Sequence, residues 1–329
     1  MKTRFTLLLA VTLAAAARDR IGLIEFFGYQ GLDVDAIRKA LPIQEGGWYD
    51  DQNQGPLRDA IRRVAGGEPT DIASVCCDEH GRSILFIGLP GESTREFRLD
   101  AKPTGAVRLP PELVALFESL DEAMEAAVRK GGDAPQEDSN PGYLLIKYPP
   151  ARKLEMQVRE YALAHAAELE DVLRHSCDSQ QRSRAADALG YAERSERQIA
   201  ALLGACRDAD DGVRNEATRA LGEILRADAP MARQIPAALF VEMIGSGIWT
   251  DRNKASMVLT ALTQSRDPEL LAQLKSQAWE PLVEMARWRS GHAVMGRLIL
   301  GRIQGIPEDR LTPLVYANLP VFLDALGVK

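Results

Sequence analysis

Few side chains of this 329-residue chain are spaced as catalysis or metal binding requires. Its four histidines are far apart: His80 lies in an expected turn, His165 and His175 on one long expected helix, and His292 in a later segment. Glu168 follows His165 by three residues and therefore shares its helix face. A protein metal site takes three or four ligands, so we interpret this pair as an exposed surface contact and predict no metal site.

The four cysteines, Cys76, Cys77, Cys177 and Cys206, also lack a metal-binding pattern, because none of their spacings is C-x-x-C. Cys76 and Cys77 are adjacent in an expected strand, so their side chains should point to opposite faces. We interpret the cysteines as small buried thiols. In an oxidising compartment, a Cys177–Cys206 disulfide is the alternative.

Sequence motifs for nucleophilic or nucleotide chemistry are missing, since no G-x-S-x-G, Walker A or G-x-G-x-x-G pattern occurs. The glycine pairs that begin at residues 46, 66 and 131 stand at expected element ends, where positive φ angles explain them. The sequence therefore predicts no enzyme and no cofactor.

The N-terminus has the order of a bacterial signal peptide. Lys2 and Arg4 precede an apolar run at residues 5–17, which ends in the small residues Ala14 to Ala17. Thirteen apolar residues are too few to span a bilayer core of about 30 Å, and a buried N-terminal helix is the alternative. We expect residues 1–17 to direct export to the periplasm or the extracellular space and to be removed.

Net charge limits the class of partner. Removal of Lys2 and Arg4 with the signal peptide changes the net charge from −7 to −9, and no basic block remains. This argues against nucleic acid or anionic lipid as the main partner. No later apolar run reaches membrane length, so we expect no stable membrane insertion after cleavage.

Residues 18–107 are expected to form a small α+β domain with two helices on one face of a mixed sheet. Apolar periodicity and turn residues predict, in order, a strand at 21–27, helices at 32–41 and 56–64, and strands at 72–77 and 83–89 joined by a hairpin turn at 78–82.

These elements resemble a POTRA domain, the polypeptide-transport-associated module. The resemblance rests on residues 24–28 as first strand and turn, 35–41 as first helix, Gly46-Gly47 before the second helix, and 84–88 as closing strand. It implies that client strands add to a sheet edge. Members in outer-membrane assembly factors are followed by a β-barrel, whereas the rest of this chain is helical, which favours a generic interaction module.

Residues 108–150 connect this domain to the C-terminal half. A periodic apolar pattern predicts a helix at 112–129, an acidic exposed loop at 133–141 and a strand at 143–148. A lone strand leaves its backbone groups unpaired, so addition to the N-terminal sheet is slightly favoured.

The C-terminal half, residues 151–329, repeats itself. A shift of 32 residues places D-S-Q-Q-R-S-R-A-A-D-A-L-G (178–190) on D-D-G-V-R-N-E-A-T-R-A-L-G (210–222). Matching positions are Asp178 and Asp210, Arg182 and Arg214, Ala188 and Ala220, Leu189 and Leu221, and Gly190 and Gly222. A weaker copy, 41 residues beyond the second, places Asp251 on Asp210, and a degenerate fourth copy ends at 298–303.

The second copy closely resembles a HEAT repeat, including the subgroup named after phycobiliprotein lyases. Such repeats imply antiparallel helix pairs that stack into a solenoid, with the second helix of each pair on the concave face. The expected fold is thus multidomain: a small POTRA-like α+β domain, then an all-α HEAT-repeat solenoid. HEAT proteins that are di-iron hydroxylases carry repeated His-Glu dipeptides, which this sequence lacks.

The repeated residues are expected to be structural. Asp178 and Asp210 can cap helix N-termini, the alanines allow close helix approach, and the leucines fill the core. Arg182 and Arg214 are expected to pair with neighbouring acids in a ladder between repeats. The alternative is that these arginines form a ligand-binding row.

Three functions are compatible with these patterns. The leading hypothesis is an exported, non-catalytic scaffold that binds a protein or peptide along its solenoid. A second is an envelope assembly or secretion accessory that binds clients at the POTRA-like sheet edge. A third is a lyase-like enzyme that binds a cofactor, although repeat resemblance alone carries no activity.

Overall fold

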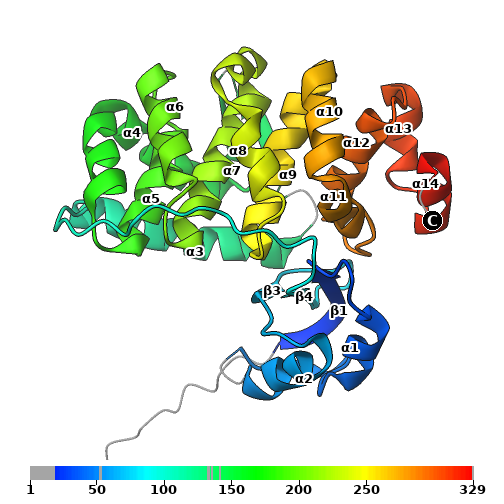
Figure 1. Ribbon diagram of the computed structural model, residues 1–329. Helices are drawn as coiled ribbons and strands as arrows, with labels where there is room; N and C mark the ends of the chain where they lie inside the picture. The colour runs from blue at the N-terminus through cyan, green and yellow to red at the C-terminus, as the bar shows by residue number, and fades with distance from the viewer. Residues whose placement is uncertain (1–18, 52–53, 132–133, 135, 141, 328–329) are drawn as a thin grey trace, which may run out of the picture.

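The computed structural model describes residues 19–51, 54–131, 134, 136–140 and 142–327. A small α+β domain packs against one side of a long row of helices (Figure 1). This is the predicted fold class, an α+β domain followed by a helical-repeat solenoid. The predicted signal peptide, residues 1–17, lies outside the described residues. None of the described helices has both the length and the apolar character needed to cross a membrane.

The N-terminal domain contains a four-stranded sheet with the order β2-β1-β4-β3, in which β1 is parallel to β4 and the other neighbours are antiparallel. Its elements are β1 (Asp19–Phe27), α1 (Val34–Ala40), β2 (Trp48–Tyr49), α2 (Gly55–Ala65), β3 (Asp71–Val75) and β4 (Ser83–Gly88). The expected hairpin turn is present, because Asp78 N–H donates to Arg82 O at 2.8 Å. The short edge strand β2 was not predicted, since two residues carry no alternation pattern.

Both faces of this sheet are buried. On β4, Leu85 and Ile87 join the core under α1 and α2, whereas Ile84 and Phe86 join the core of the solenoid. Successive side chains of a strand point to opposite faces, so a continuous apolar strand is required between two helical layers. The N-terminal domain therefore packs on the solenoid through one face of its sheet and is not a separate, independently exposed domain.

Cys76 and Cys77 correct a prediction. Strand β3 ends at Val75, so the expected alternation of side chains no longer applies to the two cysteines. They are exposed, they are linked by a cis peptide bond, and their sulfurs form a disulfide with each other. Cys177 and Cys206 are free thiols, so the alternative disulfide between them is absent.

Paired helices make up the rest of the chain. They are α4 (Pro149–His175), α5 (Ser179–Gly190), α6 (Glu196–Ala205), α7 (Asp211–Ala227), α8 (Ala237–Met243), α9 (Trp249–Leu262), α10 (Pro268–Gln277), α11 (Trp279–Ala286), α12 (Ala293–Ile303), α13 (Glu308–Leu314) and α14 (Leu319–Leu326), with 3₁₀ turns η1 (Ala229–Gln234) and η2 (Thr263–Ser265). The second helices α5, α7, α9 and α12 pack on one another in sequence and form what we call the second-helix row.

The connecting region packs on this solenoid. Helix α3 (Pro111–Lys130) lies across the repeat helices (Figure 1), and strands β5 (Glu137–Asn140) and β6 (Tyr143–Ile146) form a separate antiparallel hairpin. Two expectations are wrong here: residues 137–140 are a strand and not a loop, and 143–146 does not join the N-terminal sheet. The neighbouring strand satisfies the backbone groups of β6 locally, so no distant partner is needed.

Candidate binding surfaces

The repeated residues serve capping and packing. Asp178 accepts hydrogen bonds from the backbone N–H groups at the start of α5, and Asp210 does the same for α7. A Cβ atom at Gly190 would lie 3.2 Å from the Cβ of Ala220, so the small residues let α5 and α7 approach closely. The other repeated alanines and leucines, Ala188, Leu189 and Leu221, are buried in the solenoid core.

The repeated arginines form the expected ladder. Arg182 is fully buried and donates from Nε and Nη2 to both oxygens of Asp208, each at 2.7 Å. Arg214 makes the same two contacts with Asp251, at 2.8 and 3.0 Å. Each arginine joins its own repeat to the next, and every charge is matched. These guanidinium groups are therefore not available as a row of ligand-binding cations.

The sequence alignment missed the third arginine–acid pair of the ladder, which Arg252 forms with Glu284. Arg252 donates to the carbonyl of Ser246 and to Glu284, repeating the contacts of Arg214 one helix pair later. The N-cap of α9 is Ile248, whose side chain makes no capping bond, so Asp251 does not occupy the position of Asp210. A slip of three residues is nearly one helical turn and keeps the same apolar face, which explains the misalignment.

The N-terminal domain docks on the end of this ladder. Phe86 of β4 packs against the rings of Trp249, Trp288 and His292, with centroids 4.9 to 5.5 Å apart. Trp288 Nε1 donates to the carbonyl of Phe26 at 2.9 Å. Burial and the nearby charge of Lys254 lower the pKa of His292 to about 4, so the ring is neutral at physiological pH.

An extended segment, residues 93–109, runs from this domain along the ends of the helix pairs (cyan in Figure 1). We call it the strap. Its main chain bonds the solenoid at five-residue intervals and in reverse repeat order: Arg95 N–H to Gly245 O at 2.8 Å, Asp100 N–H to Arg207 O at 2.7 Å, and Gly105 O from Cys177 N–H at 2.7 Å. The solenoid therefore already holds one extended polypeptide.

The first part of the second-helix row is covered as well. Arg184 of α5 pairs with Asp121 of α3, and Arg226 of α7 pairs with Glu137 of the hairpin. Apolar residues of α3 and β6, including Leu113, Phe117, Leu120, Leu145 and Ile146, belong to the solenoid core. The face that the resemblance assigned to partners is thus occupied by the chain itself over α5 and α7.

The histidine pair is a surface contact, as predicted: His165 Nδ1 lies 3.4 Å from Glu168 Oε2, and both side chains are exposed. Helix α4 is kinked at His165, whose φ of −128° is not helical. Within the described part of the chain, no three histidine, cysteine or acidic side chains are grouped closely enough to hold a metal ion.

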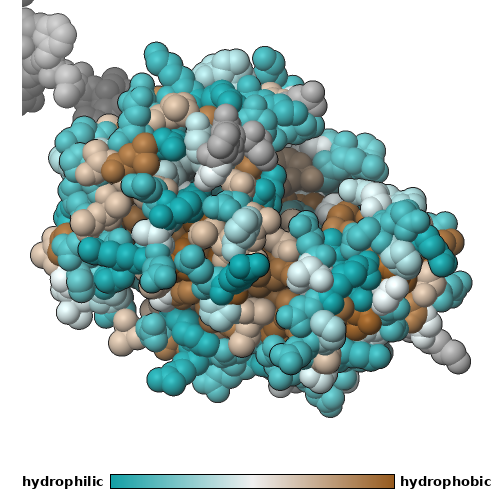
Figure 2. Space-filling view, turned by 90° about the horizontal axis from the view of Figure 1, so that it is seen from above, coloured by the Kyte–Doolittle hydropathy of each residue, from teal (hydrophilic) through white to brown (hydrophobic). Residues whose placement is uncertain are grey.

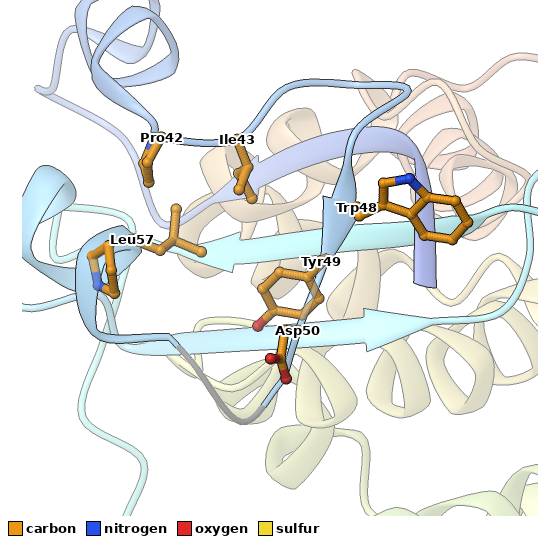
Figure 3. Close-up of a pocket in the computed structure, with 7 residues that line it drawn as sticks. Pro42, Ile43, Trp48, Tyr49, Asp50 and Leu57 are labelled. Carbon is orange, nitrogen blue, oxygen red and sulfur yellow. The ribbon is translucent and has the colours of Figure 1, made fainter. Parts of the chain in front are cut away.

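Sequence reasoning missed a pocket of about 270 Å³ at the edge strand β2. It is lined by Pro42, Ile43, Trp48, Tyr49, Asp50, Pro56 and Leu57. Figure 3 shows Tyr49 and Leu57 directed toward this space, whereas the indole of Trp48 extends to the other side of the strand. Trp48 is 63% exposed. The aromatic pair after Gly46-Gly47 was the available signal.

A second exposed aromatic residue lies at the C-terminal end of the solenoid. Tyr316, between α13 and α14, is 74% exposed, and Val321 on α14 is also exposed. Figure 2 shows that hydrophobic atoms on the upper face gather toward its middle among mainly hydrophilic surroundings. At the C-terminal helices α13 and α14, the apolar side chains of Tyr316 and Val321 are thus exposed.

Comparison with known families agrees with the architecture. Residues 166–239 match the family model for HEAT repeats, and this range contains the first two of the four copies recognised in the sequence, 178–190 and 210–222. No curated protein matches the chain significantly.

Proposed function

We propose that this chain is an exported, non-catalytic scaffold that binds a protein or peptide partner through its solenoid. The HEAT repeats support this proposal, because such repeats commonly mediate protein–protein interactions. Export is supported by the order of basic, apolar and small residues in 1–17. The acidic charge of the mature chain favours a protein partner over nucleic acid.

The exposure of Tyr316 is the observation from which we propose a binding surface. Tyrosine and tryptophan dominate the residues that contribute most to protein interfaces, and Tyr316 is the most exposed of the large apolar side chains described. The second-helix row is covered over α5 and α7, whereas α13 and α14 have no such cover from the strap or the hairpin. We therefore place the partner at the C-terminal helix pairs.

The test is site-specific photo-crosslinking in the source cells with the whole chain. A crosslinking residue replaces Tyr316 in one variant and Leu163, an exposed residue on α4, in a matched control. We expect a defined adduct from position 316 and none from position 163. Equal labelling at both positions, or labelling at neither, would contradict a partner at the C-terminal end.

Trp48 supports a second candidate, the envelope assembly or secretion accessory. Its indole is exposed on an edge strand whose outer side has no neighbouring strand among the described residues, and the same strand lines a pocket on its other side (Figure 3). Edge strands can accept an added client strand. A third crosslinking variant at position 48 separates the candidates, because an adduct from 48 alone would assign recognition to the POTRA-like domain.

The lyase-like alternative rests on repeat residues alone. Asp178, Arg182, Asp210 and Arg214 are engaged in caps and ion pairs, which leaves them no evident role toward a cofactor. An absorption band of a bound chromophore in the purified chain would reopen this alternative.

A further inference from the structure

We propose that the turn at residues 28–30, Ser93 and Arg252 form a preorganised carboxylate-binding site. The side chain of Glu284 is the ligand that occupies it. The site latches the N-terminal domain to the solenoid. Five donors converge on the two carboxylate oxygens of Glu284: Gly28 N–H at 2.7 Å, Tyr29 N–H at 2.9 Å, Gln30 N–H at 3.2 Å, Arg252 Nη1 at 2.9 Å, and the hydroxyl of Ser93.

The backbone of the turn is shaped for an anion. Strand β1 ends at Phe27, and Gly28 has a φ of +72°, a conformation that residues with a side chain rarely adopt. A Cβ at Gly28 would lie 2.1 Å from the hydroxyl oxygen of Thr94. Successive main-chain N–H groups that point to one centre form a nest, which binds negative charge.

Because Glu284 is buried, its carboxylate needs full compensation by hydrogen bonds and a cation. Glu284 is 3% exposed, and Ser93 and Arg252 are buried with it. A buried carboxylate is tolerated only when charge and hydrogen bonds compensate for lost hydration. Arg252 also donates to the carbonyl of Ser93 at 3.1 Å, so the cation joins the turn, the strap and the solenoid at one point.

The donor set selects a carboxylate over an amide. A glutamine at 284 would offer one oxygen and would turn an NH₂ group toward main-chain donors that cannot reverse. A small carboxylate such as formate would satisfy the same donors if the side chain were removed. If Glu284 only filled space, neither the preference for a carboxylate over an amide nor the binding of formate would be expected.

The experiment uses the chain from residue 18 to 329 with Glu284→Ala and Glu284→Gln. Thermal unfolding is followed in sodium formate and in sodium chloride at equal ionic strength. We expect both substitutions to lower Tm by at least about 4 °C. Formate should restore part of this loss in the Ala variant, where the site is empty, and not in the Gln variant or the unsubstituted chain.

Two outcomes would overturn the proposal: a Glu284→Gln variant as stable as the unsubstituted chain, or a Glu284→Ala variant whose Tm does not respond to formate. If the Ala variant does not fold, refolding yield in formate against chloride gives the same comparison. Ser93→Ala provides a further check, since it should lower Tm in the unsubstituted chain and have a smaller effect beside Glu284→Ala. Neither readout needs a partner, so the result is independent of the proposed scaffold function.

Discussion

Arg252 and Glu284, paired at 2.9 Å, belong at once to the repeat ladder and to the domain junction. Arg182 and Arg214 each bind an acid of the following repeat with two nitrogen atoms. Arg252 uses one nitrogen for Glu284 and another for the carbonyl of Ser93. The same interaction that stacks the repeats therefore also fixes the N-terminal domain.

We expect that removing one partner of a ladder ion pair lowers the free energy of unfolding more than replacing both partners with apolar residues. Arg214→Ala leaves the carboxylate of Asp251 buried without its cation, and we expect a loss of about 3–5 kcal/mol in the free energy of unfolding. Arg214→Met combined with Asp251→Leu should lose less. Urea unfolding measures both. The control is Arg226→Ala, which breaks a more exposed pair with Glu137 and should cost no more than about 1 kcal/mol.

Glu155 should make stability fall as pH rises. Burial is the main cause that raises its pKa to about 7, although Ile146 N–H and the Tyr191 hydroxyl donate to it. Because the folded chain holds this proton more tightly than the unfolded chain, its contribution to stability is complete below pH 4.5 and lost as pH passes 7.

The corresponding test is Glu155→Gln, which does not titrate. Its amide oxygen can accept from Ile146 N–H, while its NH₂ group can donate to the hydroxyl oxygen of Tyr191. Denaturant unfolding at pH 5 and pH 7.5 should show a smaller decrease in this variant, by up to about 3 kcal/mol. An unchanged pH dependence would contradict the assignment. Glu223, whose pKa burial also raises to about 7, is left in place and accounts for a remaining slope.

Thiol counting checks the cysteine pairing. In denaturant without reductant, only Cys177 and Cys206 should be alkylated, because Cys76 and Cys77 are linked to each other. With reductant, all four should react. Mass spectrometry of the intact chain gives the count. Four labelled cysteines in protein isolated without reductant would show that the exposed pair is reduced.

A solenoid fragment cut at residue 151 should be poorly folded. It lacks α3, whose Leu113, Phe117 and Leu120 are buried in the common core. Loss of that burial is on the order of 5 kcal/mol. A fragment of residues 108–329 retains this cover and should unfold at a higher urea concentration, as judged by circular dichroism. Equal midpoints would show that α3 adds little.

The sequence predicted the repeats well because their key positions are chemically distinctive. Capping aspartates, buried arginines and the Ala-Leu-Gly ends recur at 178–190 and 210–222, and their local roles follow from helix geometry alone. The third repeat was placed three residues off. Its cap is an isoleucine, Ile248, and helical periodicity cannot distinguish registers that differ by about one turn.

The junction could not be predicted in the same way. Glu284 and Gly28 are 256 residues apart, and neither carries a motif that names the other. A lone glutamate in an amphipathic helix has the pattern of a solvated charge, and a glycine after a strand has the pattern of a turn. Only the packed structure shows that the turn is an anion nest and that the acid enters it.

The strap places a constraint on how this architecture can vary. Because it contacts successive helix pairs once every five residues, its length and the number of repeats between α4 and α9 are coupled. Inserting a helix pair there would separate the anchors unless about five strap residues were added at the same time. Relatives with more or fewer repeats should therefore show compensating changes in the length of the strap. The length of the strap thus sets the number of repeats that can lie between its two ends.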